Sequence, residues 1–189
     1  MRIILGSQSP RRRELMAGLD IPFTAISIDA DETYPAYLQA GDIPYYISRA
    51  KARAYEAQLA DEELLITADT VVWLDGRMLG KPHDEAEAIE MLQCLRSNTH
   101  QVYTAVTLAQ KGKELETFVD CKDVTFGNLS DDEIAYYVSQ YKPFDKAGSY
   151  GVQEWIGYVA CTAMNGSYFN VMGFPVHRVY QALKNRGIV

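Results

Sequence analysis

The most informative segment of this chain of 189 residues is Ile3-Ile4-Leu5-Gly6-Ser7-Gln8-Ser9-Pro10-Arg11-Arg12-Arg13. Its three apolar residues predict a buried strand. Ser9 is a favourable helix N-cap, and Pro10 suits the first helical position because its missing N–H would have no partner there. We therefore expect a strand, a tight turn and a helix in direct succession.

Three arginines occupy the first turn of this expected helix. Cations at that end oppose the helix dipole, which favours anions. The arrangement becomes favourable when a multiply charged anion docks there, because free backbone N–H groups, hydroxyls and guanidinium groups all bind phosphate oxygens. The alternative is a solvated basic turn. The sequence favours a phosphate site made of Ser7, Ser9, Arg11, Arg12 and Arg13.

The composition limits the classes of partner. A formal net charge of −7 and an isoelectric point of about 5.0 argue against duplex nucleic acid and anionic membranes, which need a basic surface. The local arginines suit a small anionic ligand. With 48% hydrophobic residues, we expect residues 1–189 to form one domain of two lobes that share a core.

No segment predicts a signal peptide or a membrane span, so we expect a cytoplasmic protein. The three cysteines are widely spaced and lack a nearby histidine, which makes structural zinc a poor interpretation. We expect Cys94, Cys121 and Cys161 to be buried reduced thiols.

Apolar spacing predicts a mixed α/β fold rather than a regular doubly wound one. Helices are expected near residues 10–17, 42–59, 84–95, 130–138 and 175–187, with Asp42 as the cap of the second. Strands are expected near residues 3–5, 23–28, 64–68, 71–74, 77–79, 102–108, 115–126, 158–164 and 168–172, the last two as a hairpin about Asn165-Gly166.

Polar segments adjoin several of these strands, where ligands bind in open α/β sheets. They comprise residues 7–13, 31–32, 69–70, 80–82 and 145–153. Asp69 is the sharpest case, because it stands between two apolar runs, where a charge needs a partner or a task. The alternative is a carboxylate that caps a local turn. Since Glu32, Lys81 and the arginines lie on similar segments, we favour a functional role.

Carboxylates with several lysines and arginines, and no Ser-His-Asp or Cys-His set, indicate metal-assisted phosphoryl chemistry. Carboxylate oxygens suit Mg²⁺, and a carboxylate can also activate water. The chain lacks the phosphate-binding motif G-x-x-x-x-G-K-[ST] and G-x-G-x-x-G. The residues alone therefore point to an enzyme for phosphate esters or anhydrides that uses a divalent metal.

Six blocks, in order along nearly the whole chain, resemble the Maf family of nucleoside triphosphate pyrophosphatases. They are residues 5–15, 31–32, 68–72, 79–82, 145–153 and 166–175. The resemblance implies an elongated, twisted mixed sheet flanked by helices, with two lobes about a central cleft, similar to the inosine-triphosphate pyrophosphatases. It also implies hydrolysis of a nucleoside triphosphate to the monophosphate and pyrophosphate with Mg²⁺ or Mn²⁺. A homodimer is one assembly compatible with it.

The resemblance also implies roles for matching positions. Asp69 would be the proton acceptor that activates water, and Arg12, Thr70 and Gln153 would set substrate specificity. Lys51 and Lys81 would bind phosphates, and Glu32 with Asp69 would hold the metal.

The blocks around Asp69 and Gln153 resemble the branch of the family that takes dTTP and UTP. Thr70 and Gln153 would contact the pyrimidine edge, whereas an alternative role for Gln153 is to brace the loop from Gly148 to Gly151. A house-cleaning role on non-standard nucleotides also fits. Two alternatives stay open, a pyrophosphatase for another nucleotide such as 7-methyl-GTP and a non-enzymatic regulator of septum formation.

Overall fold

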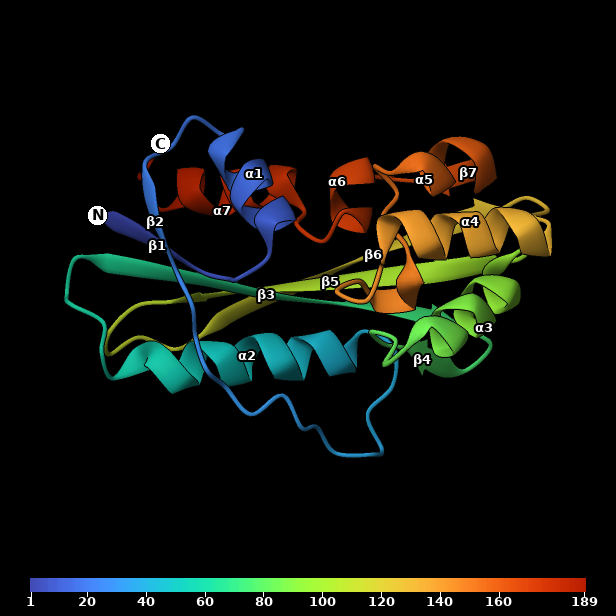
Figure 1. The fold of residues 1–189 in the computed structure, drawn as a ribbon. Coiled ribbons are helices and arrows are strands. Elements are labelled where there is room, and N and C mark those ends of the chain that lie inside the picture. Colours follow the sequence, from blue (N-terminus) through green and yellow to red (C-terminus); the bar gives the residue numbers. More distant parts are fainter.

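The computed structural model, which describes residues 1–189, is built on one seven-stranded mixed sheet (Figure 1). Its strands are β1 Arg2–Gly6, β2 Phe23–Ile26, β3 Glu63–Leu74, β4 Arg77–Leu79, β5 Thr99–Ala109, β6 Glu116–Phe126 and β7 Cys161–Asn165. The order is β2-β1-β3-β5-β6-β7, with β4 paired to β3. The first three strands run parallel and the remaining pairs antiparallel, so the expected mixed α/β class is confirmed.

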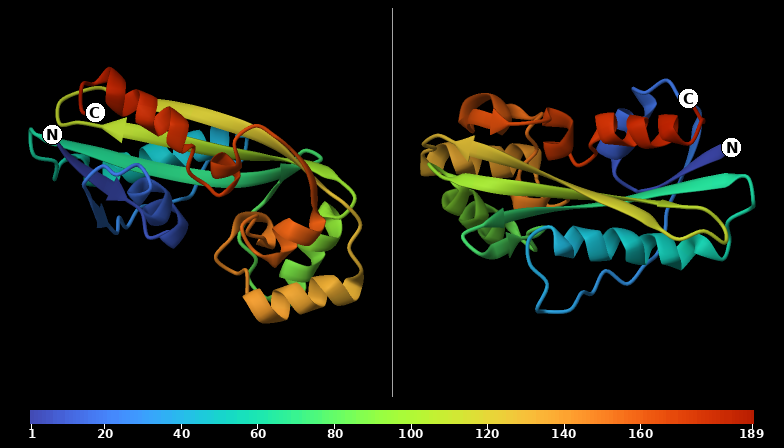
Figure 2. Two further views of the ribbon diagram at one scale, coloured as in Figure 1. Left: turned by 90° about the horizontal axis from the view of Figure 1, so that it is seen from above. Right: turned by 180° about the vertical axis from the view of Figure 1, so that it is seen from behind.

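Helices cover both faces of this sheet. They are α1 Pro10–Ala17, α2 Asp42–Glu56, α3 Glu85–Leu95, α4 Asp131–Tyr141, α5 Trp155–Ala160, α6 Tyr168–Val171 and α7 Val176–Asn185, with a 3₁₀ turn η1 at Ala147–Ser149. Helix α2 lies under the sheet in Figure 1, and α1 and α7 lie above its left end. Seen from above, α1 is separated from the group of α3, α4 and α5 (Figure 2, left). No helix is long and apolar enough to cross a membrane.

Helices α1 and α4 begin with the local hydrogen bonds that the sequence predicted. The Ser9 hydroxyl accepts from the Arg12 N–H at 3.4 Å, and Pro10 stands in the first turn. Ser130 and Glu133 form a complete capping box at the start of α4. Asp42 is not the cap of α2: Gly41 is, without a side-chain hydrogen bond, and Asp42 lies in the first turn.

The core consists mainly of two buried clusters at opposite ends of the sheet. The larger one packs α3, α4 and α5 against the sheet through residues such as Leu92, Phe126 and Tyr137. The second packs α1 and α7 against β1 and β3 through Leu5, Met16 and Phe174. The three cysteines are unpaired as expected, but none of them is fully buried, which corrects that part of the prediction.

The expected hairpin of residues 158–164 and 168–172 is wrong. Residues 155–160 form α5, because Ile156 and Ala160, four positions apart, are the two buried residues of this segment. Tyr158, although a good strand former, is 84% exposed on the outer side. Only 161–165 form a strand, which pairs with β6, and residues 168–171 form α6.

Strand β3 also differs from the prediction, because it passes through Asp69 and Thr70 without a break. Pairing with β5 explains this continuity: Asp69 lies opposite Ala105, and Thr70 opposite Thr104. The pair of polar residues is therefore in the middle of a central strand rather than at its end. Pairing with β5 keeps β3 regular at this point, while on the opposite edge of β3 the partner strand changes from β1 to β4.

Candidate active site

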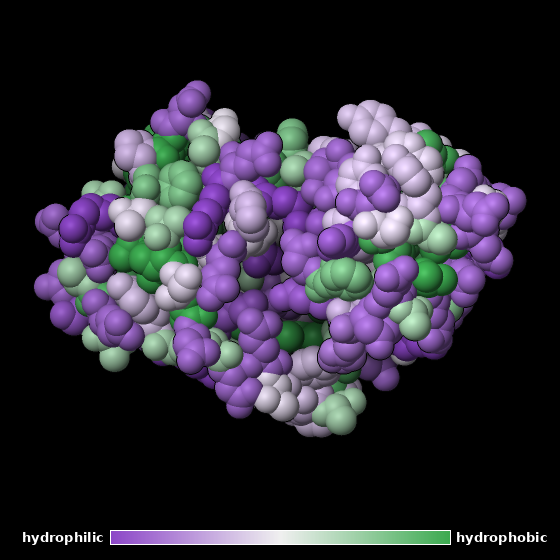
Figure 3. Space-filling model, in the orientation of Figure 1, coloured by the Kyte–Doolittle hydropathy of each residue, from purple (hydrophilic) through white to green (hydrophobic).

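A cavity of about 650 Å³ opens beside the middle of β3. Strand β1 pairs with β3 only as far as Thr67, and β4 begins its pairing at Val72. Residues 68–71 therefore have no strand on that edge, and the cavity lies in the gap, beyond the carboxyl end of β1. Hydrophilic residues surround the hollow at the centre of Figure 3. Such a place, where parallel strands end, is where open α/β sheets bind ligands.

Asp69 forms the α2 side of this cavity. Lys51, on α2, donates to Asp69 Oδ1 at 2.9 Å and lies 3.2 Å from Glu32 Oε1. Burial raises the pKa of Asp69, while Lys51 and Arg12 lower it and Glu32 raises it further. The result is a carboxylate in the cavity wall, held in place by an ammonium group, with a raised pKa that suits a proton acceptor.

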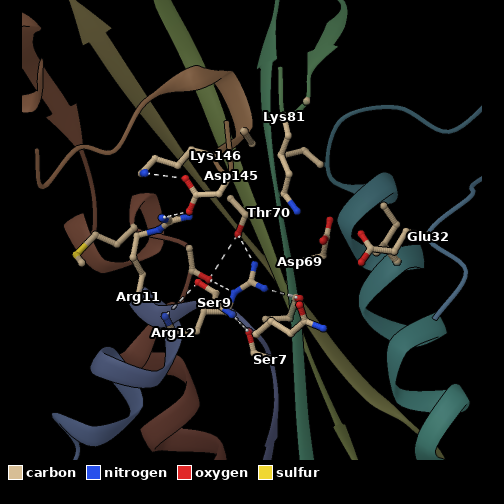
Figure 4. Close-up of a pocket in the computed structure, with 18 of the residues that line it drawn as sticks. Ser7, Ser9, Arg11, Arg12, Glu32, Asp69, Thr70, Lys81, Asp145 and Lys146 are labelled. Carbon is tan, nitrogen blue, oxygen red and sulfur yellow. Dashed lines mark hydrogen bonds and ion pairs between the residues drawn. The ribbon is translucent and has the colours of Figure 1, made fainter. Parts of the chain in front are cut away.

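Lys81 is the free cation of the site. It follows β4, its side chain points toward Asp69 in Figure 4, and it has neither a hydrogen bond nor an ion pair within the protein. Arg11, by contrast, reaches across the mouth of the cavity and donates to Asp145 Oδ2 at 3.1 Å. Both cations therefore face the same space from opposite walls, which suits a polyanionic ligand.

Arg12 is held on the other side of β3. Its guanidinium donates to Gly173 O at 2.9 Å, to Ala68 O at 2.9 Å and to Thr70 Oγ1 at 3.1 Å. Burial lowers the pKa of Arg12, and the nearby charge of Asp69 opposes this shift. Three of its five N–H donors are thus used by the protein, so that α1, β3 and the turn at Gly173 are tied together.

Residues 145–153 close the cavity from the second lobe. Gly148 adopts φ +68°, and a Cβ atom there would lie 3.0 Å from Val72, so only glycine lets this loop pack on β3. Its N–H donates to Gly80 O at 3.0 Å. Gln153 lines the cavity, and its Oε1 is buried without a hydrogen-bond partner. That oxygen is an acceptor that the protein itself leaves without a donor.

Comparison with known proteins shows the family of this chain. The family described as Maf-like protein matches residues 2–186. This chain belongs to the Maf family. It is 52% identical over 184 residues to a protein of Bacteroides fragilis named dTTP/UTP pyrophosphatase, covering 97% of this chain and 95% of that protein. A Porphyromonas gingivalis protein of the same name is 52% identical over 189 residues, covering 98% and 94%.

The Maf chain also shares its fold with a solved structure of very different sequence. A HAM1 protein from Coxiella burnetii superimposes with a TM-score of 0.54 at 14% identity, covering 98% of this chain and 99% of that one. At this identity the likeness concerns the fold alone. It agrees with the mixed, two-lobed architecture expected from the resemblance.

The residues predicted for this Maf site come together almost completely. All of them except one line the cavity, namely Ser7, Ser9, Arg11, Arg12, Glu32, Lys51, Asp69, Thr70, Lys81 and Gln153. Arg13 is the exception: it lies outside the lining and donates to Ser7 O at 3.0 Å. Arg13 therefore supports the turn before α1 from outside the cavity lining.

The sequence did not predict the roles of several residues that support the site. Lys146 is only 8% exposed, donates to Asp145 Oδ1 at 2.8 Å and lies 3.2 Å from Glu154 Oε1. Tyr137 in turn donates to Glu154. This network supports the carboxylate that receives Arg11. Its only signal in the sequence is the Asp-Lys pair beside the glycine-rich loop, since the partners are distant along the chain.

Proposed function

We propose that this Maf protein hydrolyses dTTP and UTP to the nucleoside monophosphate and pyrophosphate. The observation that carries the proposal is the Asp69 carboxylate, paired with Lys51 in the wall of a cavity that Lys81 and Arg11 also enter. The names of the relatives from Bacteroides fragilis and Porphyromonas gingivalis support the choice of nucleotides. A non-enzymatic regulator would not need this combination of a held carboxylate and a free cation.

Different site residues bind the phosphates and activate the water in this reaction. Lys81 and Arg11 hold the phosphate chain from two walls, with the first turn of α1 and its serine hydroxyls beside them. Asp69 accepts the proton of a water molecule through a carboxylate oxygen as the water attacks the anhydride between the first and second phosphates. The water oxygen forms a bond to one of these two phosphorus atoms, and the bond from that phosphorus to the bridging oxygen breaks. The monophosphate and pyrophosphate are thereby separated, and Asp69 later releases its proton to solvent.

The residues present also fit a divalent metal. Glu32 and Asp69 both contact the ammonium group of Lys51, so their carboxylate oxygens lie close together in one part of the cavity wall. No group of three or more carboxylate, histidine or cysteine ligands exists, which suits Mg²⁺ or Mn²⁺ held by one or two carboxylates and the substrate phosphates. When bound, the metal would neutralise charge on the phosphates.

Base selection follows from Gln153. Its buried Oε1 has no partner in the protein and can accept the N3–H of uracil or thymine, while its amide N–H can donate to O4. With the amide held in this orientation, cytosine would lose both bonds, because it presents an acceptor at N3 and a donor at position 4. A buried acceptor left without a partner makes such a base a poor substrate.

The test is the value of kcat/KM for dTTP, UTP, CTP and GTP in the presence of Mg²⁺ or Mn²⁺, measured as pyrophosphate release. We expect dTTP and UTP to be preferred, and Gln153→Ala to lower this preference while pyrophosphate remains the product. Release of inorganic phosphate in place of pyrophosphate, or a wild-type preference for CTP or GTP, would contradict the proposal. Unchanged selectivity in Gln153→Ala would remove only the role of this residue.

A further inference from the structure

A line of hydrogen bonds runs from Arg12 into the core behind the cavity. Arg12 donates to Thr70 Oγ1 at 3.1 Å, the hydroxyls of Thr70 and Thr104 are 2.9 Å apart, and Thr104 donates to Asn170 O at 3.0 Å. Thr104 and Asn170 are fully buried. Register explains the central contact, because Thr104 on β5 lies directly opposite Thr70 on β3.

The two ends of this line limit the direction of its bonds. A guanidinium can only donate and a carbonyl can only accept. When Thr104 gives its single proton to Asn170 O, the proton of Thr70 goes to Thr104 Oγ1 or, at 3.5 Å, to Gly173 O. Thr70 consequently has no proton left for a nucleotide base, although it lines the cavity. Any influence of Thr70 on specificity must act mainly through what it holds in place.

The same line of bonds holds one wall of the cavity. Gly173, at φ +104°, would carry a Cβ atom only 3.2 Å from Thr70 Oγ1, so the turn lies directly against the Thr70 hydroxyl. Asn170 also donates from Nδ2 to Val102 O at 3.2 Å, which fixes α6 on β5. The segment that follows, residues 171–173, lines the cavity, whereas Thr104 itself does not.

We propose that Thr104 is a specificity-determining positioning residue, which fixes the Thr70 hydroxyl and the wall at residues 171–173 without touching substrate. The inference rests on the proposed function and extends it to a residue behind the site. Asp69 lies on the opposite face of β3 from Thr70, since neighbouring side chains of a strand alternate. Loss of the Thr104 hydroxyl should therefore change the choice of base more than the rate of the chemical step.

The experiment compares Thr104→Val, Thr104→Ser and the matched control Thr107→Val. Thr107 is also fully buried on β5 and hydrogen-bonds Ser48 and Thr117, outside the cavity lining. Thr104→Val removes the nearer acceptor of the Thr70 proton and leaves only Gly173 O at 3.5 Å, so this proton can serve the N3 acceptor of cytosine. We expect the ratio of kcat/KM for UTP to that for CTP to fall by about tenfold, the worth of one hydrogen bond. The value of kcat for UTP should change by less than about threefold, which is less than the effect of one hydrogen bond.

Thr104→Ser keeps the hydroxyl and should restore the wild-type ratio, and Thr107→Val should leave it unchanged. If Thr104→Val does not fold, Thr104→Ala provides the same loss of hydroxyl at smaller volume. A ratio unchanged in the folded variant would overturn the proposal, as would an equal fall in Thr107→Val. Both outcomes are separate from failure of the proposed function, which would show as a wild type without pyrophosphate release.

Amide hydrogen exchange gives a second measurement that does not depend on activity. The Gly173 N–H donates to Asn170 O at 2.9 Å, on the same carbonyl that receives Thr104. Its exchange should be faster in Thr104→Val and unchanged in Thr107→Val. Unchanged exchange in Thr104→Val would overturn the proposed hold on this wall even for an inactive enzyme. Faster exchange with unchanged selectivity would leave Thr104 a purely structural role and overturn the proposal as well.

Discussion

Lys51 Nζ lies 2.9 Å from Asp69 Oδ1, and each side chain is 13% exposed in the cavity wall. The ammonium group has two opposing consequences for this carboxylate. It lowers the pKa of Asp69 by attraction, yet burial raises that pKa more. The pair therefore combines a raised pKa, which makes the carboxylate a better proton acceptor, with a neighbouring cation that favours its ionised form.

The pH dependence of kcat/KM should report this pair. Activity requires ionised Asp69, so it should fall at acid pH with a midpoint above the ordinary pKa of an aspartate, near 3.9. Lys51→Met removes the attraction and should move the midpoint to higher pH. Glu32→Gln removes a neighbouring negative charge and should move it to lower pH. Shifts of the same sign in both variants would contradict this electrostatic account.

Asp69→Asn should nearly abolish turnover without unfolding the protein. Asparagine keeps the shape but cannot accept a proton, and loss of a general base costs about 10²- to 10⁴-fold in rate. Steady-state assays with dTTP, together with circular dichroism, measure both effects. Asp75→Asn, in the β3–β4 turn at φ +49°, is the matched control, because asparagine tolerates that conformation. Near wild-type turnover in Asp69→Asn would remove its assigned role.

Arg12→Ala should weaken substrate binding and also destabilise the fold. The change removes three hydrogen bonds that tie α1 to β3 and to Gly173, and one such bond from a charged group contributes about 1.5–3 kcal/mol. Urea unfolding and KM for UTP are the measurements. Arg13→Ala removes the same charge from the same turn but lies outside the cavity lining. Equal KM values for the two variants would show that substrate binding depends on the positive charge of this turn and not on the position of Arg12.

Stability at acid pH should depend on His100, which is fully buried against Phe126 and Tyr150. Burial lowers the pKa of His100 to about 4, whereas the unfolded chain titrates near 6.5. Between these values the unfolded state binds the proton and the folded state does not. The free energy of unfolding should therefore decrease by about 2 kcal/mol between pH 7 and pH 5, and by about 3 kcal/mol at pH 4.

Urea titrations at these pH values measure the effect of His100. His100→Gln retains a hydrogen-bonding group for Tyr150, does not titrate, and should lose this contribution. His177→Gln, at an exposed position of α7, should keep it. An identical pH dependence in wild type and His100→Gln would place the acid sensitivity in other groups.

The boundaries of local structure were largely predictable because their causes are local. Ser9 and Pro10 start α1, and Ser130 with Glu133 starts α4, through hydrogen bonds that span only three residues. The hairpin predicted for residues 158–164 and 168–172 is wrong. Its aromatic and β-branched residues favour strands, but packing of Ile156 and Ala160 on the core selected a helix instead.

The members of the site were predictable as types, whereas their arrangement was not. A carboxylate, lysines and arginines on short polar segments indicated phosphate chemistry, and the matching blocks predicted roles for Asp69, Lys81 and Gln153. The strand break expected at Asp69 does not exist, because pairing with Ala105 continues β3 through it. The partners of Arg11 and Thr70 lie 134 and 34 residues away, distances at which sequence patterns carry no signal.

By itself, the sequence of this protein determined the starting strand–turn–helix, the caps of α1 and α4, the net negative charge and the set of chemical groups, since each depends on composition or on neighbours within one or two turns. Only the tertiary structure decided that β1 ends at Gly6 while β3 continues, so that a cavity opens beside Asp69. It also decided that Arg12 and Thr70 are held by hydrogen bonds instead of being free. Both outcomes arise from long-range pairing and packing, whose energies depend on residues that meet only in the folded chain.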